Sequence, residues 1–186
     1  MAVQPTRRRF TVDEYYWMAR VGILGEDDRV ELRDGEIVEM PPIGPEHAST
    51  VDDVSCNFVR SFSDLARVRV KNPIRLDRFN EPEPDVALVT RRKDGYRAAH
   101  PTPEDVFLVV EVSDTTLAED LRRKVPLYAT YRVPEVWVID VNQQAIRVYR
   151  DPVDDSFRLV QALRRGESLA PLAFPDRQLS VDDLLG

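Results

Sequence analysis

Two carboxylates stand beside short apolar runs of the sequence, where valine, isoleucine or leucine would be the ordinary residue. Asp85 precedes the run Val-Ala-Leu-Val, and Glu111 follows the run Val-Phe-Leu-Val-Val further along the chain. Both runs are typical of buried strands. Burying an unpaired carboxylate is costly unless a cation or hydrogen-bond donors compensate its charge. Two carboxylates on neighbouring strands therefore indicate a shared cation.

The spacing of these carboxylates depends on how their strands pair. If the strands are antiparallel neighbours, the start of one lies beside the end of the other, and the β-carbons of Asp85 and Glu111 come within ~5 Å. That separation suits one Mg²⁺ or Mn²⁺, which can lower the pKa of a bound water until the water attacks a phosphodiester. The structural alternative is that Asp85 caps a turn after Pro84 and Glu111 pairs with an arginine.

Lys124 is a third candidate, because it occupies the apolar stripe of its predicted helix between Leu121 and Tyr128, where a cation is normally excluded. Of 26 Lys and Arg residues only three are lysines, which leaves 23 arginines. A compact ammonium beside a metal can orient the attacking water or neutralise developing phosphate charge. The alternative is a lysine that reaches solvent from the end of the stripe.

Glu31 and His47 are weaker candidates. Glu31 lies between Arg29 and Arg33, so it is either an exposed member of an ion-pair row or a further metal-site carboxylate. His47 heads a long apolar stripe, which favours a hydrogen-bonded core histidine over a substrate contact. Cys56 has no partner base in the sequence pattern, so we assign it no chemistry.

Three arginines are the candidates for contacting a substrate backbone: Arg91, Arg92 and Arg122. The first two fall in residues 90–105, a stretch without strand or helix pattern, and loops of that length often bind ligands. The net charge of −7 argues against a protein that coats nucleic acid through a general positive field. The simpler interpretation of each basic stretch is a solvated face.

The first half of the chain must build the elements that position these residues. A capping-box pattern at Thr11 and Glu14 predicts a helix over residues 11–20, and the pair Asp34-Gly35 predicts a hairpin over residues 29–40. Apolar residues at steps of three and four predict a helix over residues 45–66. Further strands are predicted at residues 67–71 and 74–77, and an extended segment at residues 79–84.

The second half predicts a β-α-β unit. Strands are expected from Asp85 onward, at residues 106–112 and at residues 135–141, with a helix from Thr115 that Pro126 must kink or restart. The strands at 106–112 and 135–141 should therefore be parallel within a mixed sheet. Strands at 145–149 and 157–163 and a short helix at 180–186 complete the chain.

Length and composition limit the remaining possibilities. The chain of 186 residues, 42% of them hydrophobic, suits a single domain over residues 1–186, with residues 1–9 flexible. Without a long apolar run or a signal-peptide pattern, we expect a cytoplasmic protein with no membrane partner. One cysteine and two histidines argue against a zinc site, so any metal should be a hard ion held by oxygen.

Several motifs together resemble the Uma family of restriction-endonuclease-like proteins, within the PD-(D/E)XK nuclease superfamily. They are Val-Glu31-Leu-Arg-Asp-Gly-Glu-Ile, Gly-Pro-Glu-His47, Glu-Pro-Asp85-Val, Val-Val-Glu111-Val-Ser, Asp120 and Lys124 with Leu127-Tyr128, and Pro134-Glu-Val-Trp137-Val-Ile-Asp140. The resemblance spans Phe10 to Leu184. It implies an α/β (α+β mixed) restriction-endonuclease-like core, in which helices flank a mixed sheet preceded by an N-terminal helix and hairpin.

The resemblance also implies roles for residues. By it, Asp85 and Glu111 are metal ligands and Glu31 is a further acidic member of the site. The superfamily pattern places a lysine two residues after the second acid, where this chain has Ser113. Members of this type supply the amine from the following helix, which gives that role to Lys124.

Three functions remain open. The first is an endonuclease acting on DNA with one or two Mg²⁺ or Mn²⁺ ions, in which Asp85 and Glu111 hold the metal and Lys124 positions water. The second is a catalytically silent nuclease fold that works as an oligomeric binding or regulatory module, for which a homodimer is one form. The third is metal-dependent hydrolysis of another phosphoester.

Overall fold

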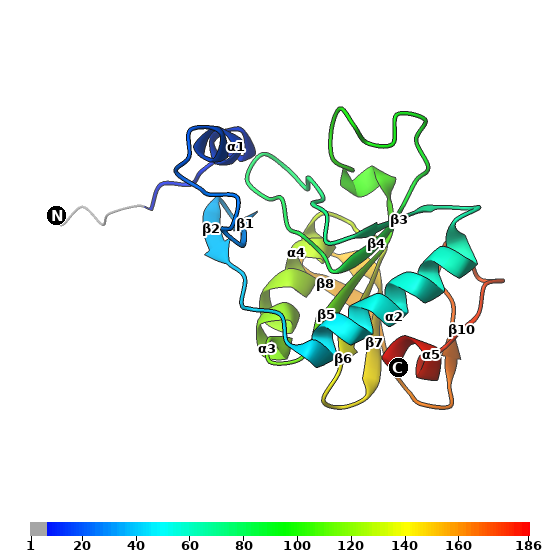
Figure 1. Cartoon of the computed structure of the whole chain (residues 1–186). Coiled ribbons are helices and arrows are strands. Elements are labelled where there is room, and N and C mark those ends of the chain that lie inside the picture. The colour runs from blue at the N-terminus through cyan, green and yellow to red at the C-terminus, as the bar shows by residue number, and fades with distance from the viewer. Residues whose placement is uncertain (1–6) are drawn as a thin grey trace.

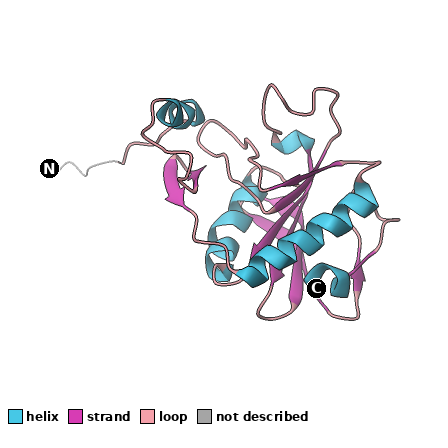
Figure 2. Ribbon diagram, viewed as in Figure 1, coloured by secondary structure: helices cyan, strands magenta, loops and turns pink. Residues whose placement is uncertain are grey.

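The computed structural model describes residues 7–186, whose centre is a six-stranded mixed sheet (Figures 1 and 2). Its strand order is β3-β4-β5-β6-β7-β8. The strands are β3 (Arg67–Val70), β4 (Val86–Val89), β5 (Val106–Ser113), β6 (Glu135–Asp140), β7 (Ala145–Val153) and β8 (Ser156–Arg164). Only the β5–β6 pairing is parallel within this sheet. The predicted mixed sheet with a parallel β-α-β pair is confirmed.

Helices cover both faces of this sheet. The long α2 (Pro45–Phe62) crosses one face and packs with α5 (Val181–Leu185) over Leu88 and Trp137. The other face buries Val109 and Val138 against Tyr128 of α4 (Val125–Thr130). Since side chains alternate along a strand, Glu111 shares the α4-facing side of β5 with Val109. This alternation decides which helix can supply partners for Glu111.

The N-terminal part forms a separate small unit beside the sheet, made of α1 (Val12–Arg20) and the hairpin of β1 (Val30–Arg33) and β2 (Glu36–Glu39) (Figure 1). Thr11 and Glu14 form the predicted capping box. Asp34 and Gly35 have φ values of 51° and 73°, as a type I′ turn requires, so the predicted hairpin is confirmed.

The hairpin is fastened to the segment that leads into β4. Gly35 N donates to Phe79 O at 2.9 Å, and Glu81 N donates to Leu32 O at 2.8 Å. Arg9 Nε also donates to Asp34 O at 2.8 Å. Residues 1–6, part of the segment expected to be flexible, lie outside the described residues. The hairpin thereby holds Glu31 next to the segment that carries Asp85.

Two predictions about local structure were wrong. Residues 74–77 form no strand, because this segment folds back on residues 80–82: Ile74 N donates to Pro82 O, and Leu76 N to Asn80 O, both at 3.0 Å. The helix predicted to reach residue 66 ends at Phe62. A short pair of strands, β9 (Ser168–Leu169) and β10 (Leu179–Ser180), was not predicted.

The helix predicted after Thr115 is divided into three parts. It consists of α3 (Leu117–Glu119), a π-helical turn (Asp120–Lys124) and α4, and a single 3₁₀ turn (Pro103–Asp105) precedes β5. Pro126 lies in the first turn of α4, where its missing N–H is tolerated, so the helix restarts there as one prediction allowed. Within residues 7–186, no helix combines the length and the apolar character needed to cross a membrane.

Candidate active site

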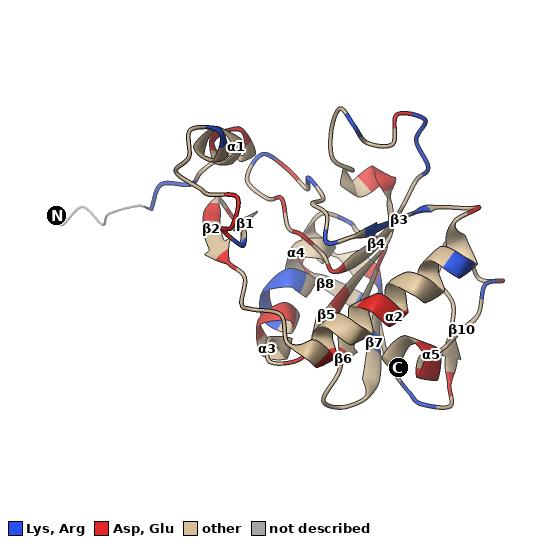
Figure 3. Cartoon of the chain, viewed as in Figure 1, with Lys and Arg blue, Asp and Glu red and all other residues tan. Residues whose placement is uncertain are grey.

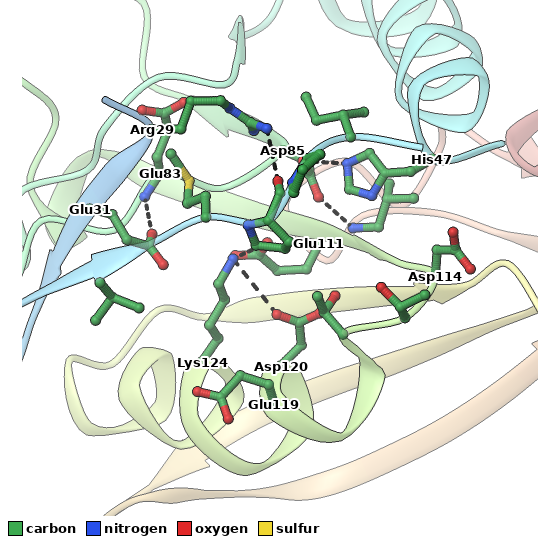
Figure 4. Close-up of a pocket in the computed structure, with 18 of the residues that line it drawn as sticks. Arg29, Glu31, His47, Glu83, Asp85, Glu111, Asp114, Glu119, Asp120 and Lys124 are labelled. Carbon is green, nitrogen blue, oxygen red and sulfur yellow. Dashed lines mark hydrogen bonds and ion pairs between the residues drawn. The ribbon is translucent and has the colours of Figure 1, made fainter. Parts of the chain in front are cut away.

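A pocket of about 330 Å³ lies beside the carboxyl end of β5 (Figure 4). Eight carboxylates line it: Glu31, Glu39, Glu83, Asp85, Glu111, Asp114, Glu119 and Asp120. Four basic residues and one histidine also line it: Arg29, Arg33, Lys71, Lys124 and His47. With the histidine counted as neutral, these groups give the pocket a formal charge of −4 (eight negative against four positive), and we call it the acidic pocket. Along the segment from α3 to Lys124, two acidic positions come first and three basic positions follow (Figure 3).

Asp85 and Glu111 meet at the inner end of the acidic pocket. The antiparallel register pairs Val86 with Val110, and one further step places Asp85 opposite Glu111. The backbone N–H of Val112 fixes this arrangement by donating to Asp85 Oδ2 at 2.8 Å. Only 7% of Asp85 and 1% of Glu111 is exposed. The antiparallel pairing expected from the sequence is therefore confirmed, and it brings the two carboxylates together.

Two side chains, those of Lys71 and His47, contact the carboxylate of Asp85. Lys71 Nζ donates to Asp85 Oδ1 at 2.7 Å, and His47 Nε2 lies 3.0 Å from the same oxygen. Burial works against a charge on this carboxyl, but His47 and Lys71 lower the pKa of Asp85 to about 2. Asp85 is consequently ionised at neutral pH.

Glu111 has its partners on the helical side. Lys124 Nζ donates to Glu111 Oε2 at 2.9 Å, and the Tyr128 hydroxyl donates to Glu111 Oε1 at 2.6 Å. Burial raises the pKa of Glu111 to about 8, against the opposing charge of Lys124, and the charge of Asp85 adds to the rise. The two carboxylates thus differ sharply in their affinity for a proton.

Lys124 ends the π-helical turn and points into the acidic pocket (Figure 4). The turn is closed by a bond from Val125 N to Asp120 O, one residue wider than an α-helical bond. Asp120 Oδ1 lies 3.7 Å from the ammonium nitrogen. Burial opposes the charged form of this amine, but Glu111, Glu31 and Asp120 together raise its pKa well above the ordinary value. The lysine of the apolar stripe is therefore a buried cation among carboxylates.

Glu31 lies at the hairpin side of the pocket and is only 3% exposed. Its Oε1 lies 3.0 Å from Arg33 Nε, and its Oε2 accepts a 3.0 Å bond from Glu83 N. Burial raises the pKa of Glu83, and the charge of Glu31 adds to this effect. Glu31 thus makes the ion pair that its neighbours suggested, but it makes it inside the pocket and not at an exposed surface.

The three arginines predicted to contact substrate do not line the acidic pocket. Arg91 Nη1 donates to Asp64 O at 2.9 Å, and Arg92 pairs with Asp94 at the same distance. Arg91 and Arg92 line a different hollow beside Arg67. Arg122 is closer to the pocket, because its partner at 3.1 Å is Glu119.

Three groups in the site escaped prediction as site residues. Lys71 belongs to a basic stretch whose simpler interpretation was a solvated face, and Tyr128 was placed only on the apolar stripe of its predicted helix. Asp120 accepts bonds from Ser113 Oγ at 2.7 Å and Thr116 Oγ1 at 2.8 Å. The rarity of lysine, which pointed to Lys124, applied equally to Lys71. The position of Tyr128 one helical turn after Lys124 was the signal for its contact with Glu111.

The donor chemistry of the pocket fits a hard divalent ion. Among residues 7–186, no group of three or more His, Cys, Asp or Glu side chains is arranged as a ready metal cluster. The two adjoining carboxylates, Asp85 and Glu111, nevertheless provide the oxygen donors that Mg²⁺ takes together with waters. Burial, with the charges of Asp85 and Asp120, raises the pKa of Glu111, and a divalent ion would favour the ionised form of this carboxyl. Asp85 and Glu111 are therefore the residues that would hold such an ion.

Comparison with known proteins agrees with this fold. A crystal structure of a putative nuclease belonging to DUF820 from Anabaena variabilis superposes with a TM-score of 0.72 at 17% identity, covering 95% of this chain and 97% of that one. At that identity the likeness concerns the fold alone. No curated protein matches the chain. The Uma2 family, described as "Putative restriction endonuclease", matches residues 12–182, and the chain belongs to this family of restriction-endonuclease-like nucleases.

Proposed function

We propose that the protein is an endonuclease that hydrolyses DNA phosphodiester bonds with one or two Mg²⁺ or Mn²⁺ ions. The observation that carries the proposal is the convergence of Asp85, Glu111 and Lys124, whose ammonium lies 2.9 Å from Glu111 Oε2. Two carboxylates that can hold a divalent ion, with an adjoining amine, suit metal-assisted attack of water on phosphorus. Membership of a nuclease family supports the same reaction class.

In this proposal Asp85 and Glu111 hold the metal, and Lys124 positions the attacking water. A bound divalent ion would polarise the phosphate and lower the pKa of that water. The ammonium of Lys124 is fixed by Glu111 and Asp120, so it can donate to the water oxygen without searching among rotamers. The water gives up a proton to solvent as its oxygen forms a bond to phosphorus. The bond from phosphorus to the leaving oxygen breaks, and that oxygen takes up a proton from solvent. Glu31 assists because it favours the charged form of the Lys124 amine.

Nicking of supercoiled plasmid DNA tests this function. The wild type should nick plasmid in Mn²⁺ or Mg²⁺ and not in a chelator, and Asp85→Asn should abolish the nicking. Asp94→Asn is a matched control, because Asp94 pairs with Arg92 in a loop outside the acidic pocket. Equal trace activity in the wild type and Asp85→Asn across all metals would reject the proposal.

A second candidate is a catalytically silent nuclease fold that binds a partner or forms a homodimer. One observation favours it: each carboxylate at the inner end of the pocket already pairs with a lysine, at 2.7 Å for Asp85 and 2.9 Å for Glu111. Such a site can be stable without a metal. Calorimetry separates the candidates, because the silent protein should show no Mn²⁺ binding that depends on Asp85 and Glu111.

A further inference from the structure

We propose that the acidic pocket accepts one nucleotide of a single nucleic-acid strand, and that a paired duplex is a poorer substrate than a single strand. This inference rests on the nuclease function proposed above, and it adds the class of substrate. Three features of the pocket carry it: the burial of its reactive groups, an apolar part of its lining, and the distribution of charge among the lining residues.

The reactive groups are too deeply placed to meet a phosphate outside the pocket. The acidic pocket has a volume of about 330 Å³, and Glu111 is 1% exposed. Pockets of roughly 300–1,000 Å³ enclose a single small ligand. A reacting phosphate must therefore leave the regular surface of its strand and enter. A single strand can do this freely, whereas a duplex must first pay for unstacking and unpairing.

An apolar wall lines the pocket together with these groups. It consists of Val38, Met40, Pro41, Pro42 and Ile43, from the end of β2 and the segment that follows it. Ile43 is 41% exposed at this wall, which is high for a large apolar side chain. Packing of the flat face of a base on such a surface lowers the free energy of the complex. This contact does not depend on the nucleic-acid sequence.

The wall is already formed before any ligand enters. Arg29 Nη1 donates to Pro41 O at 2.8 Å, and Met40 N donates to Arg29 O at 2.8 Å. Pro41 and Pro42 have fixed φ angles, so this segment has little conformational entropy to lose on binding. Met40 adds an adaptable side chain that can fit bases of different shape.

The charge around the pocket discriminates between one strand and two. Lys71 and Lys124 lie beside the reacting carboxylates, where they can receive one phosphate. Glu39, Asp114 and Glu119 line the same pocket and are only partly buried or exposed. Duplex DNA carries one charge per ~1.7 Å of its axis, so it would place several phosphates against these carboxylates. A single inserted nucleotide avoids most of that repulsion.

The test compares the full-length protein on three labelled substrates in Mn²⁺: an oligodeoxythymidine strand, the same strand paired with oligodeoxyadenosine, and the duplex with a thymidine overhang. We expect the single strand and the overhang to be cut at least about tenfold faster than the paired region, in line with the unpairing cost. The variant Ile43→Ser should raise KM for the single strand about fivefold and change kcat little, as loss of a base contact predicts.

Leu159→Ser is the matched control, because Leu159 is 61% exposed on β8 and does not line the pocket. Thermal unfolding of both variants verifies that they fold. Equal cutting of duplex and single strand, or a KM unaffected by Ile43→Ser, would overturn the inference and leave the nuclease function standing.

If no substrate is cut, the affinity of the protein for the same labelled strands, measured by fluorescence anisotropy, decides whether the inference holds. Tighter binding of the single strand that depends on Ile43 would uphold the pocket inference while the nuclease function fails. If neither the single strand nor the duplex binds, or if Ile43→Ser leaves binding unchanged, the inference is overturned as well.

Discussion

Lys124 donates a 2.9 Å hydrogen bond to Glu111, across the boundary between the π-helical turn and β5. This contact brings an amine to the site although Ser113 occupies the position where the superfamily pattern places a lysine. Ser113 still contributes, because its hydroxyl donates to Asp120, the second carboxylate beside the amine. In the proposed function, the segment after β5 supplies the amine that the strand lacks.

Replacing the amine should remove activity while leaving the fold intact. Lys124→Met keeps the apolar stem but leaves Glu111 without its cation, and we expect kcat for DNA cleavage to fall about 100-fold. Lys124→Arg should not restore it, since a planar guanidinium does not fit the place of a compact ammonium. Single-turnover cleavage at saturating Mn²⁺ measures both variants, and full activity in Lys124→Met would exclude a role in positioning water.

Tyr128→Phe should destabilise the protein by about 1–2 kcal/mol, because it removes a buried donor from Glu111. The hydroxyl donates to Glu111 Oε1 at 2.6 Å and has no exposure to water. Urea unfolding measures the change in the free energy of unfolding. Thr130→Val, at an exposed hydroxyl on the same helix, is the control. An unchanged free energy of unfolding in Tyr128→Phe would show that the bond contributes nothing net.

The free energy of unfolding should fall as pH rises between about 4.5 and about 8. The pKa of Glu111 is raised from 4.5 to about 8 in the folded protein, mainly by burial. Over that window the folded state binds the proton and the unfolded state has released it, so raising the pH favours unfolding. Glu111→Gln should flatten this part of the pH profile measured by urea unfolding. A profile identical in the wild type and the variant would contradict the assignment.

Gly35→Ala should loosen the hairpin from the segments around Arg9 and Phe79 that hold it. Gly35 has a φ of +73°, and an added Cβ would lie 2.6 Å from Arg9 Cβ, so the substitution combines backbone strain with a clash. We expect a loss of about 1–3 kcal/mol in the free energy of unfolding. Because the hairpin carries Glu31, hydrogen exchange at the amides of residues 30–39 should accelerate. Gly166→Ala, also at positive φ but with open space around it, separates strain from the clash.

The elements that place Asp85 and Glu111 were predictable because their signals are local. Alternating and continuous apolar runs identified the strands, the Asp34-Gly35 pair fixed the hairpin turn, and the helical stripe pointed to Lys124. These patterns follow from strand and helix periodicity, which a sequence displays directly.

Other features depend on contacts between distant segments. Ile74 and Leu76 alternate as in a strand, but residues 80–82 supply their hydrogen-bond partners, so the segment never joins the sheet. Lys71 lies just after β3, has a φ of 47° and bonds to Asp85. No local sequence pattern predicts that conformation. The π-helical turn that presents Lys124 also bonds to a distant segment, through Asp120 to Ser113 and through Lys124 to Glu111 of β5.

A crystal structure of the protein soaked in Mn²⁺ tests the central claim most directly, because Mn²⁺ is identified by its anomalous scattering. The proposal predicts one or two peaks at coordination distance from the oxygens of Asp85 and Glu111, with the Lys71 ammonium displaced from Asp85. Absence of a peak at full soaking, with both lysines still paired as at 2.7 and 2.9 Å, would contradict a metal-dependent nuclease and favour the silent module.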